Sequence, residues 1–191
     1  MKILAVQSRM GIGDTVIFLP FIKALSKKFN SPISILVKEN SKANQYLHQT
    51  KYIDKILTLE RDNKTNNRHG GFFGIFKLAN DLKKYKFDKI FIFNSSLRFN
   101  LVAKISGIPQ IYQYPLFTKN KQHIIETPKK FLKKNLHLDI NEDPEVQIDN
   151  DSISKAAQKF QIDKNTTNIL LGIGGSGPTK RIPAKTFLSV I

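Results

Sequence analysis

Short apolar runs alternate with longer segments of helical apolar spacing over the first two thirds of the chain. The runs predict five strands, at Ile3–Val6, Ile33–Val37, Lys55–Leu59, Lys89–Phe93 and Ile111–Tyr114. The segments between them predict helices, among them Val16–Phe29, Glu39–Gln49 and Phe72–Tyr85. Strands that alternate with helices at this spacing are typical of a parallel, doubly wound α/β sheet with helices on both faces.

Two of these helices carry features that affect their geometry or burial. Pro20 lies inside 16–29 and cannot donate a backbone hydrogen bond. We therefore expect a kink there, or a short first turn with the main helix starting near Pro20. In the helix over 72–85 we expect Phe72, Phe73 and Phe76 to face the core, because helical apolar spacing usually marks buried positions. Contact of Phe73 and Phe76 with lipid or a partner is the alternative.

The later part of the chain predicts a domain boundary. After a helix at Pro128–Leu136, the stretch Asp139–Asp151 holds six acidic residues and no Lys or Arg, so we interpret it as an interdomain linker, with a short strand at 145–148. A helix over Ser152–Phe160 follows, capped by Asp151 or Ser152. We expect residues 1–150 to form one domain and 151–191 to begin another, with a strand at 169–173 and a helix opening at Pro183.

The turn after the first strand is the first candidate site. It runs Gln7-Ser8-Arg9-Met10-Gly11-Ile12-Gly13-Asp14-Thr15, and Gly11 and Gly13 allow a tight bend. Asp14 has three interpretations: a helix N-cap, part of a dinucleotide-binding turn, or a catalytic carboxylate at the mouth of a cleft. The second fails because G-x-G-x-x-G would need a third glycine at Val16.

The stretch 172–183 is a second glycine-rich turn between a predicted strand and a predicted helix. It does not match a Walker loop. Its exposed N–H groups and cations nevertheless suit a phosphate or diphosphate, with an ordinary solvated turn as the alternative. The expected turn glycines are Gly174 and Gly175, and the expected diphosphate ligands are Ser176, Thr179, Lys180 and Arg181.

Together the two turns resemble glycosyltransferase family 9, the lipopolysaccharide heptosyltransferases. The opening strand, the turn ending in Gly13-Asp14 and the helix with Pro20 are similar to the family's start. Residues 87–98 and 107–109 continue the match, and 174–183 resembles the family's Gly-Ala-Ser and Pro-Thr-Lys-Arg-Trp-Pro motif. Gly175 replaces the usual alanine or threonine, and Ile182 replaces the tryptophan.

The resemblance implies a GT-B fold, in which two Rossmann-like domains face each other across a cleft. It implies that Asp14 is the general base of an inverting transferase and that the donor is a nucleotide-sugar, with ADP-heptose expected. The acceptor implied is an anionic glycolipid, and no cofactor is implied. No metal is needed if Lys180 and helix N–H groups neutralise the diphosphate. The family's later nucleoside-binding part has no counterpart before Ile191, so we expect the second domain to be truncated and this chain alone to be inactive.

Several cations are candidates for binding an anionic acceptor. The polar stretch Glu60–Gly71 is predicted to be a mobile loop, and it contains Arg61, Lys64 and Arg68. Arg98 is predicted in the first turn of a helix, where a cation opposes the helix dipole, which favours a ligand role. His69 lies in the same loop and could meet the same acceptor, but a single loop histidine is usually solvated, and no metal-ligand spacing surrounds it.

The charge of the chain leaves three partner classes open. Its net charge is +16, with 31 basic residues of which none falls in Asp139–Asp151. An anionic membrane face, nucleic acid or simply solvated lysines would each account for it; no RNA-binding signature accompanies the cations, so nucleic acid is disfavoured. The densest run lies between Lys119 and Lys134.

Location and cofactor use follow from what the sequence lacks. There is no cysteine, no signal peptide and no apolar run long enough to span a membrane. We expect a cytoplasmic protein, with peripheral contact at the inner face of the cytoplasmic membrane left open. A nicotinamide-dependent enzyme is a rival that lacks both the third glycine and a suitably placed acidic residue.

Overall fold

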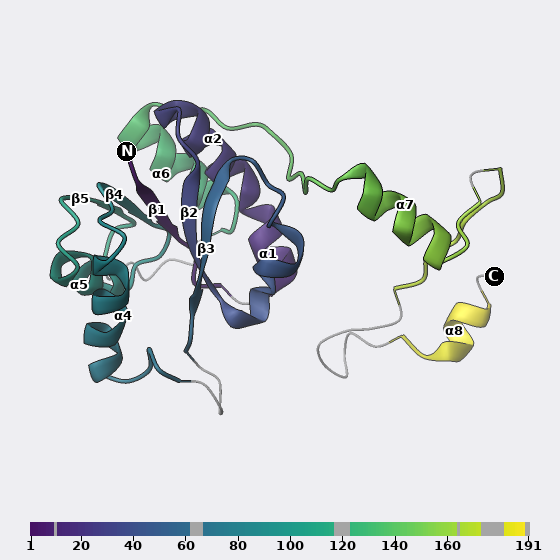
Figure 1. The fold of residues 1–191 in the computed structure, drawn as a ribbon, viewed down its shortest axis with the longest axis horizontal. Helices are drawn as coiled ribbons and strands as arrows, with labels where there is room; N and C mark the ends of the chain where they lie inside the picture. Colours follow the sequence, from purple (N-terminus) through teal and green to yellow (C-terminus); the bar gives the residue numbers. More distant parts are fainter. Residues whose placement is uncertain (10, 62–66, 117–122, 164, 173–181, 190–191) are drawn as a thin grey trace. The chain divides into compact units, whose positions relative to one another are not determined.

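The computed structural model describes residues 1–9, 11–61, 67–116, 123–163, 165–172 and 182–189 (Figure 1). The chain divides into two compact units, Met1–Ile148 and Asp149–Ile191. Each unit is described by itself below, beginning with the larger one.

A five-stranded sheet forms the centre of the first unit, and every neighbouring pair of strands is parallel. Its strands are β1 (Ile3–Val6), β2 (Ile33–Lys38), β3 (Ile53–Leu59), β4 (Lys89–Ile92) and β5 (Gln110–Gln113). The order is β3-β2-β1-β4-β5, with Ala5 of β1 opposite Ile35 and Phe91. The predicted doubly wound parallel sheet is confirmed. Because the winding direction reverses between β1 and β4, the carboxyl ends of these two strands mark the switch point, where ligands of such sheets usually bind.

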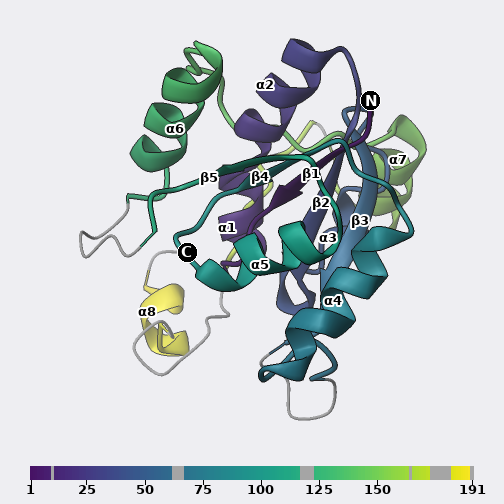
Figure 2. The ribbon, with the colours of Figure 1, turned by 90° about the vertical axis from the view of Figure 1, so that its left-hand side faces the viewer.

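Helices cover both faces of this sheet (Figure 2). One face packs against α2 (Leu19–Phe29) and α6 (Glu126–Leu136), and the other against α4 (Phe73–Lys83) and α5 (Leu97–Ile105). Successive residues of β1 alternate between the two cores: Ile3 and Ala5 contribute to the first, Leu4 and Val6 to the second. Since all four are buried, β1 is a central strand, and the turn that follows it is held on a rigid base.

The helical segment after β1 breaks next to its proline, as predicted. It forms α1 (Ile12–Ile17) and α2, with Pro20 at the second position of α2. A proline is tolerated in a first turn because its missing N–H would have no helical partner there. The break therefore separates a one-and-a-half-turn helix at the edge of the sheet from the long helix that packs on the core.

Two other helix predictions are wrong in part. The segment 39–49 is not one helix, because Lys42 adopts a left-handed φ of 49° between a 3₁₀ turn, η1 (Glu39–Ser41), and α3 (Ala43–Tyr46). In α4 the side chains of Phe72, Phe73 and Phe76 are exposed, not inward. The stripe that faces the sheet is Ile75, Leu78, Ala79 and Leu82, whose spacing of three and four residues already fills the inner face of the helix.

The boundary between the two units falls inside the acidic segment 139–151, and residues 140–145 of this segment contact the first unit. Ile140 is buried in the core beneath α2 and α6, and the carboxylate of Glu142 pairs with Lys23 at 3.3 Å and with Lys27. The Tyr52 hydroxyl donates to the carbonyl oxygen of Glu145. The described residues 145–148 form no strand.

These contacts also shift two pKa values. Hydrogen bonds and charge from Lys27 and Lys23 lower the pKa of the Glu142 carboxyl, so its stabilising effect is present above the ordinary carboxyl pKa and is lost as the pH falls through the lowered value. Burial, then the charges of Glu145 and Glu142, raise the pKa of Tyr52 to about 12.

The second unit contains two short helices in its described part. α7 (Asn150–Lys159) is capped by Asp149, whose carboxylate accepts a 2.8 Å hydrogen bond from the Ser152 amide, so the predicted caps Asp151 and Ser152 are wrong by two or three residues. α8 (Ala184–Leu188) follows Pro183 as predicted. Residues 165–172 form no strand, and Leu170 is 97% exposed. Within the described residues, no helix combines the length and apolar character that crossing a bilayer requires.

Gly74 in the first turn of α4 should be required for packing. A Cβ there would collide with the backbone carbonyl of His69 and would approach the Arg98 Nη2 atom to 2.8 Å. We expect Gly74→Ala to lower the free energy of unfolding by about 2 kcal/mol, because backbone atoms cannot yield as a flexible side chain would. Urea denaturation measures this loss.

Gly13 in α1 is the matched control for Gly74. A Cβ at Gly13 would meet no atom within 4 Å. Gly13→Ala should leave stability unchanged or raise it by up to about 1 kcal/mol, since alanine favours helix more than glycine does. Equal stabilities for the two alanine variants would contradict the packing argument.

Candidate functional site

The switch point of the sheet brings together two turns that are far apart in sequence. Gln7 and Ser8 follow β1, and Asn94 follows β4. The Asn94 Nδ2 atom donates to the Ser8 hydroxyl over 3.1 Å, so the two turns are linked directly. The turn bearing Asp14 therefore lies at the ligand-binding edge of the fold.

Asp14 is the third residue of α1 and not its N-cap. The N-cap is Gly11, whose φ of 106° favours glycine, and no side chain caps the helix. The N-cap interpretation of Asp14 is therefore wrong, but its carboxylate still lies in the first turn, where the helix dipole favours negative charge. The side chain is half-buried. Gly13 lies inside α1 without a positive φ, so only Gly11 meets the predicted need for a turn glycine.

Three hydrogen bonds to neighbouring residues hold the turn around Asp14. The Gln7 Nε2 atom donates to the Asp14 carbonyl oxygen at 3.3 Å, and the Thr15 hydroxyl donates to the Gly11 carbonyl oxygen at 3.1 Å. The Phe18 amide, just beyond α1, donates to the Thr15 carbonyl oxygen at 3.1 Å. Gln7 and Thr15 are buried, so both bonds from their side chains are shielded from water. The backbone is thus fixed while the Asp14 carboxylate keeps contact with solvent.

The turn after β4 is organised by a polar network that the sequence analysis missed. The Asn94 Oδ1 atom accepts from the Ser96 amide at 2.9 Å. The Gln113 Nε2 atom donates to the carbonyl oxygens of Asn94 and Ser96, and its Oε1 atom accepts from Asn100. Polar residues at the carboxyl ends of predicted strands, such as Gln7 and Gln113, are the sequence signal that could have indicated these roles.

Tyr114, directly after β5, lies at the same carboxyl-end edge of the sheet as the turns after β1 and β4. Its ring is buried against Phe93 and Phe131. Burial raises the pKa of its hydroxyl, and the charge of Arg9 opposes that rise. Arg9 is exposed, so it contributes a solvent-accessible cation to the turn that carries Asp14.

The cations predicted to bind an acceptor are engaged with the protein where the structure describes them. The Arg98 Nη1 atom donates to the Gly71 carbonyl oxygen at 2.7 Å, and Nη2 donates to that of His69. Arg68 pairs with Asp81 at 2.7 Å, and Arg61 is half-buried. These bonds attach the end of the loop to the last turn of α4, through Asp81, and to the start of α5, through Arg98. Lys64 lies outside the described residues.

His69 is buried, which corrects the expectation of a solvated side chain. Its Nδ1 atom accepts from the Glu60 amide at 3.1 Å, and its Nε2 atom lies 3.0 Å from the Asp81 carboxylate. Since Nδ1 is an acceptor, the proton is on Nε2 and is donated to Asp81. The imidazole therefore links the backbone at Glu60 to the Asp81 carboxylate of α4.

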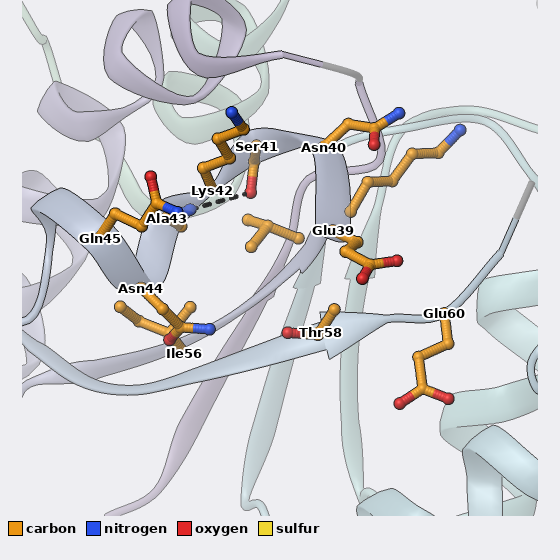
Figure 3. A pocket seen from close by; sticks show the side chains of 12 residues that line it. Glu39, Asn40, Ser41, Lys42, Ala43, Asn44, Gln45, Ile56, Thr58 and Glu60 are labelled. Atoms are coloured by element: carbon orange, nitrogen blue, oxygen red, sulfur yellow. Dashed lines mark hydrogen bonds between the residues drawn. The ribbon is translucent and has the colours of Figure 1, made fainter. Parts of the chain in front are cut away.

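A polar pocket of about 590 Å³ lies at the carboxyl ends of β2 and β3 (Figure 3). Its lining includes positively charged, negatively charged and neutral polar side chains: Lys38, Glu39, Asn40, Ser41, Lys42, Asn44, Gln45, Thr58 and Glu60. The Ser41 hydroxyl accepts from the Ala43 amide, which fixes the η1–α3 turn on one side. η1 packs against α1, so the pocket adjoins the helix that carries Asp14. Mixed polar groups of this kind suit a hydroxylated ligand.

The predicted ligands of the second turn are not among the described residues. Gly174, Gly175, Ser176, Thr179, Lys180 and Arg181 all lie outside the described residues. Among the residues that are described, no group of three or more His, Asp or Glu side chains could hold a metal ion.

Two solved structures share the fold. The chain superposes on the crystal structure of a family 9 glycosyl transferase from Veillonella parvula DSM 2008 with a TM-score of 0.76 and 19% identity, over 99% of this chain and 58% of that one. It superposes on E. coli ADP-heptose lipopolysaccharide heptosyltransferase II with a TM-score of 0.56 and 15% identity, over 86% and 52%. The chain thus spans somewhat more than half the length of these neighbours.

No protein-family profile and no curated protein matches the chain by sequence. The structural superpositions show that the parallel sheet with helices on both faces matches the fold of GT-B-type glycosyltransferases, as predicted. In particular, the resemblance to glycosyltransferase family 9 seen in the sequence motifs extends to the three-dimensional fold.

Proposed function

We propose that this chain provides the acceptor side of an inverting glycosyltransferase of the family 9 type. One observation carries the proposal: Asp14 lies in the first turn of α1, at the switch point of the sheet, within a fold that glycosyltransferases share. A carboxylate with solvent contact on a fixed backbone is the arrangement that a general base needs.

The proposed reaction uses Asp14 to remove the proton from an acceptor hydroxyl. The hydroxyl oxygen attacks the anomeric carbon of the nucleotide-sugar, and the bond from that carbon to the diphosphate oxygen breaks as the new glycosidic bond forms. Attack from the face opposite the leaving group inverts the anomeric configuration. Lys180 and Arg181, with the hydroxyls of Ser176 and Thr179, are proposed to neutralise the departing diphosphate.

The proposed donor is ADP-heptose and the proposed acceptor is an anionic glycolipid. The donor follows from the motif resemblance and from the neighbour that acts on ADP-heptose. The pocket at the carboxyl ends of β2 and β3 supports a glycan acceptor, because it adjoins α1 and its lining combines neutral polar groups with two lysines and two glutamates, Lys38, Lys42, Glu39 and Glu60. Arg61, Lys64, Arg68 and Arg98 remain proposed acceptor contacts, although Arg68 and Arg98 first serve to hold the loop. Such a donor and acceptor would meet at the cytoplasmic face of a membrane.

A donor panel tests this proposal on the complete gene product. ADP-heptose, UDP-N-acetylglucosamine and NADH would each be offered with a lipid-linked saccharide acceptor, and release of nucleoside diphosphate would be followed together with product mass. We expect ADP release and a mass gain of one heptose only with ADP-heptose. Release of UDP with transfer of N-acetylglucosamine would contradict ADP-heptose as the donor. NADH binding without any sugar transfer would contradict the assignment to glycosyltransferases.

A further inference from the structure

Exposed aromatic side chains gather at the start of α4. Phe72, Phe73 and Phe76 are 68%, 75% and 48% exposed. Their rings touch one another edge to face, with centroids 6.0 Å apart for Phe72 and Phe73 and 5.6 Å apart for Phe72 and Phe76. A contiguous aromatic cluster in water is unfavourable, and such patches on soluble domains usually mark an interaction surface.

The neighbouring helix also exposes apolar side chains. α5 packs against α4, and its residues Leu97, Leu101 and Ile105 recur every fourth position and are exposed. We call the two sets of side chains together the α4–α5 patch. Because both helices cover the same face of the sheet, the patch lies on one side of the domain (Figure 2).

The two helices that carry the patch also carry exposed lysines. Lys77, Lys83 and Lys104 on the two helices are exposed, whereas their only acid, Asp81, is engaged with Arg68 and His69. Lysine is depleted from the cores of protein–protein interfaces. Exposed Phe and Leu beside Lys is the composition of surfaces that insert into the headgroup region of anionic bilayers.

We propose that the α4–α5 patch is a docking surface for an anionic lipid bilayer, with the phenylalanines inserted and the lysines against lipid phosphates. The Arg98 bond to the Gly71 carbonyl places Phe72 beside the start of α5, at the edge of the sheet that also carries Asn94 and the Asp14 turn. Docking therefore brings that edge close to the membrane. The idea that docking gives the Asp14 turn access to a lipid-borne acceptor rests on the proposed function, whereas the predicted membrane binding does not depend on it.

The basic helix α6 provides an internal comparison. Its exposed residues Lys130, Lys133 and Lys134 lie on the opposite face of the sheet, and its one phenylalanine, Phe131, is buried. A single flat bilayer cannot contact both faces at once. If the patch is the docking surface, charge on α6 contributes little to binding.

Vesicle sedimentation of the 191-residue chain tests the proposal. We expect binding to vesicles that contain phosphatidylglycerol and much weaker binding to phosphatidylcholine alone. The double variant Phe73→Ser/Phe76→Ser should lower the partition coefficient by about 100-fold, or about tenfold for each ring withdrawn from the bilayer. Lys77→Gln/Lys104→Gln should lower it by about fivefold per lysine, and Lys130→Gln/Lys134→Gln by less than about twofold.

Three results would overturn the proposal. They are wild-type binding by the phenylalanine variant, equal losses from the α4–α5 and α6 lysine variants, or self-association that the phenylalanine variant abolishes in a chain that binds no vesicles. All the substituted side chains are exposed or partly exposed on the surface, so unchanged thermal melting should show that each variant folds.

Discussion

Asp14→Asn should reduce turnover of the complete gene product by about 100-fold or more, because asparagine cannot accept the proton of the acceptor hydroxyl. The fold should persist, since the residue sits in the first turn of α1 and the turn is held by the bonds of Gln7 and Thr15 to backbone oxygens. Initial rates of nucleoside diphosphate release, measured at several donor concentrations, separate kcat from KM. We expect the Asp14→Asn substitution to lower kcat and to leave the KM for the donor unchanged.

Asp151→Asn is the control for this substitution. Asp151 is an exposed carboxylate in α7 that pairs with Lys155, and it belongs to no proposed site. Its loss should leave turnover unchanged. Near-normal turnover in Asp14→Asn with correct folding would remove Asp14 from the chemistry and leave it as a residue that favours the helix start.

Lys180→Ala should lower turnover by about 100-fold, the effect of removing a group that stabilises developing charge in a transition state. In the sequence 172–183, Lys180 lies among glycines, two hydroxyl side chains and a second cation, a combination that suits a diphosphate. The donor KM should rise as well, because the diphosphate is charged before and after transfer. Rates with saturating and subsaturating nucleotide-sugar measure both effects, and the melting temperature should change little.

Lys185→Ala is the matched control, because Lys185 is an exposed lysine five residues further on, in α8. Its removal should affect neither rate nor KM. A sharp fall in melting temperature for Lys180→Ala, with normal activity per folded molecule, would make Lys180 structural and would contradict the diphosphate site.

Local patterns in the sequence were sufficient to predict the sheet and its main breaks. The central strands β1, β2 and β4 are short apolar runs whose residues are largely buried on both sides, as Leu4 and Ala5 of β1 show, and this pattern is visible without any tertiary information. The break near Pro20 and the start of α8 after Pro183 follow from the missing N–H and fixed φ of proline. The position of the Asp14 turn at the carboxyl end of β1 follows from the same strand-turn-helix order.

What the sequence could not decide depends on contacts between distant segments. As a single histidine in a polar loop, His69 is expected to be solvated, but in the structure Asp81 and the Glu60 amide hydrogen-bond its ring. Arg98 was assigned to an acceptor because of its place in a helix, yet its guanidinium reaches the carbonyl oxygens of Gly71 and His69. Glu142 lies in the acidic segment that the sequence predicts to be an interdomain linker, and its ion pairs with Lys23 and Lys27 are visible only in the structure.

The phenylalanines of α4 show the same division most clearly. The sequence determined by itself that 73–83 is an amphipathic helix over a parallel sheet, because the apolar period is local. It offered more apolar residues than one helix face can hold, and only the packing of Ile75, Leu78 and Leu82 on the sheet decided which ones are buried. Phe72, Phe73 and Phe76 were left outside because space in a core is limited by the elements that close it, and those elements come from elsewhere in the chain.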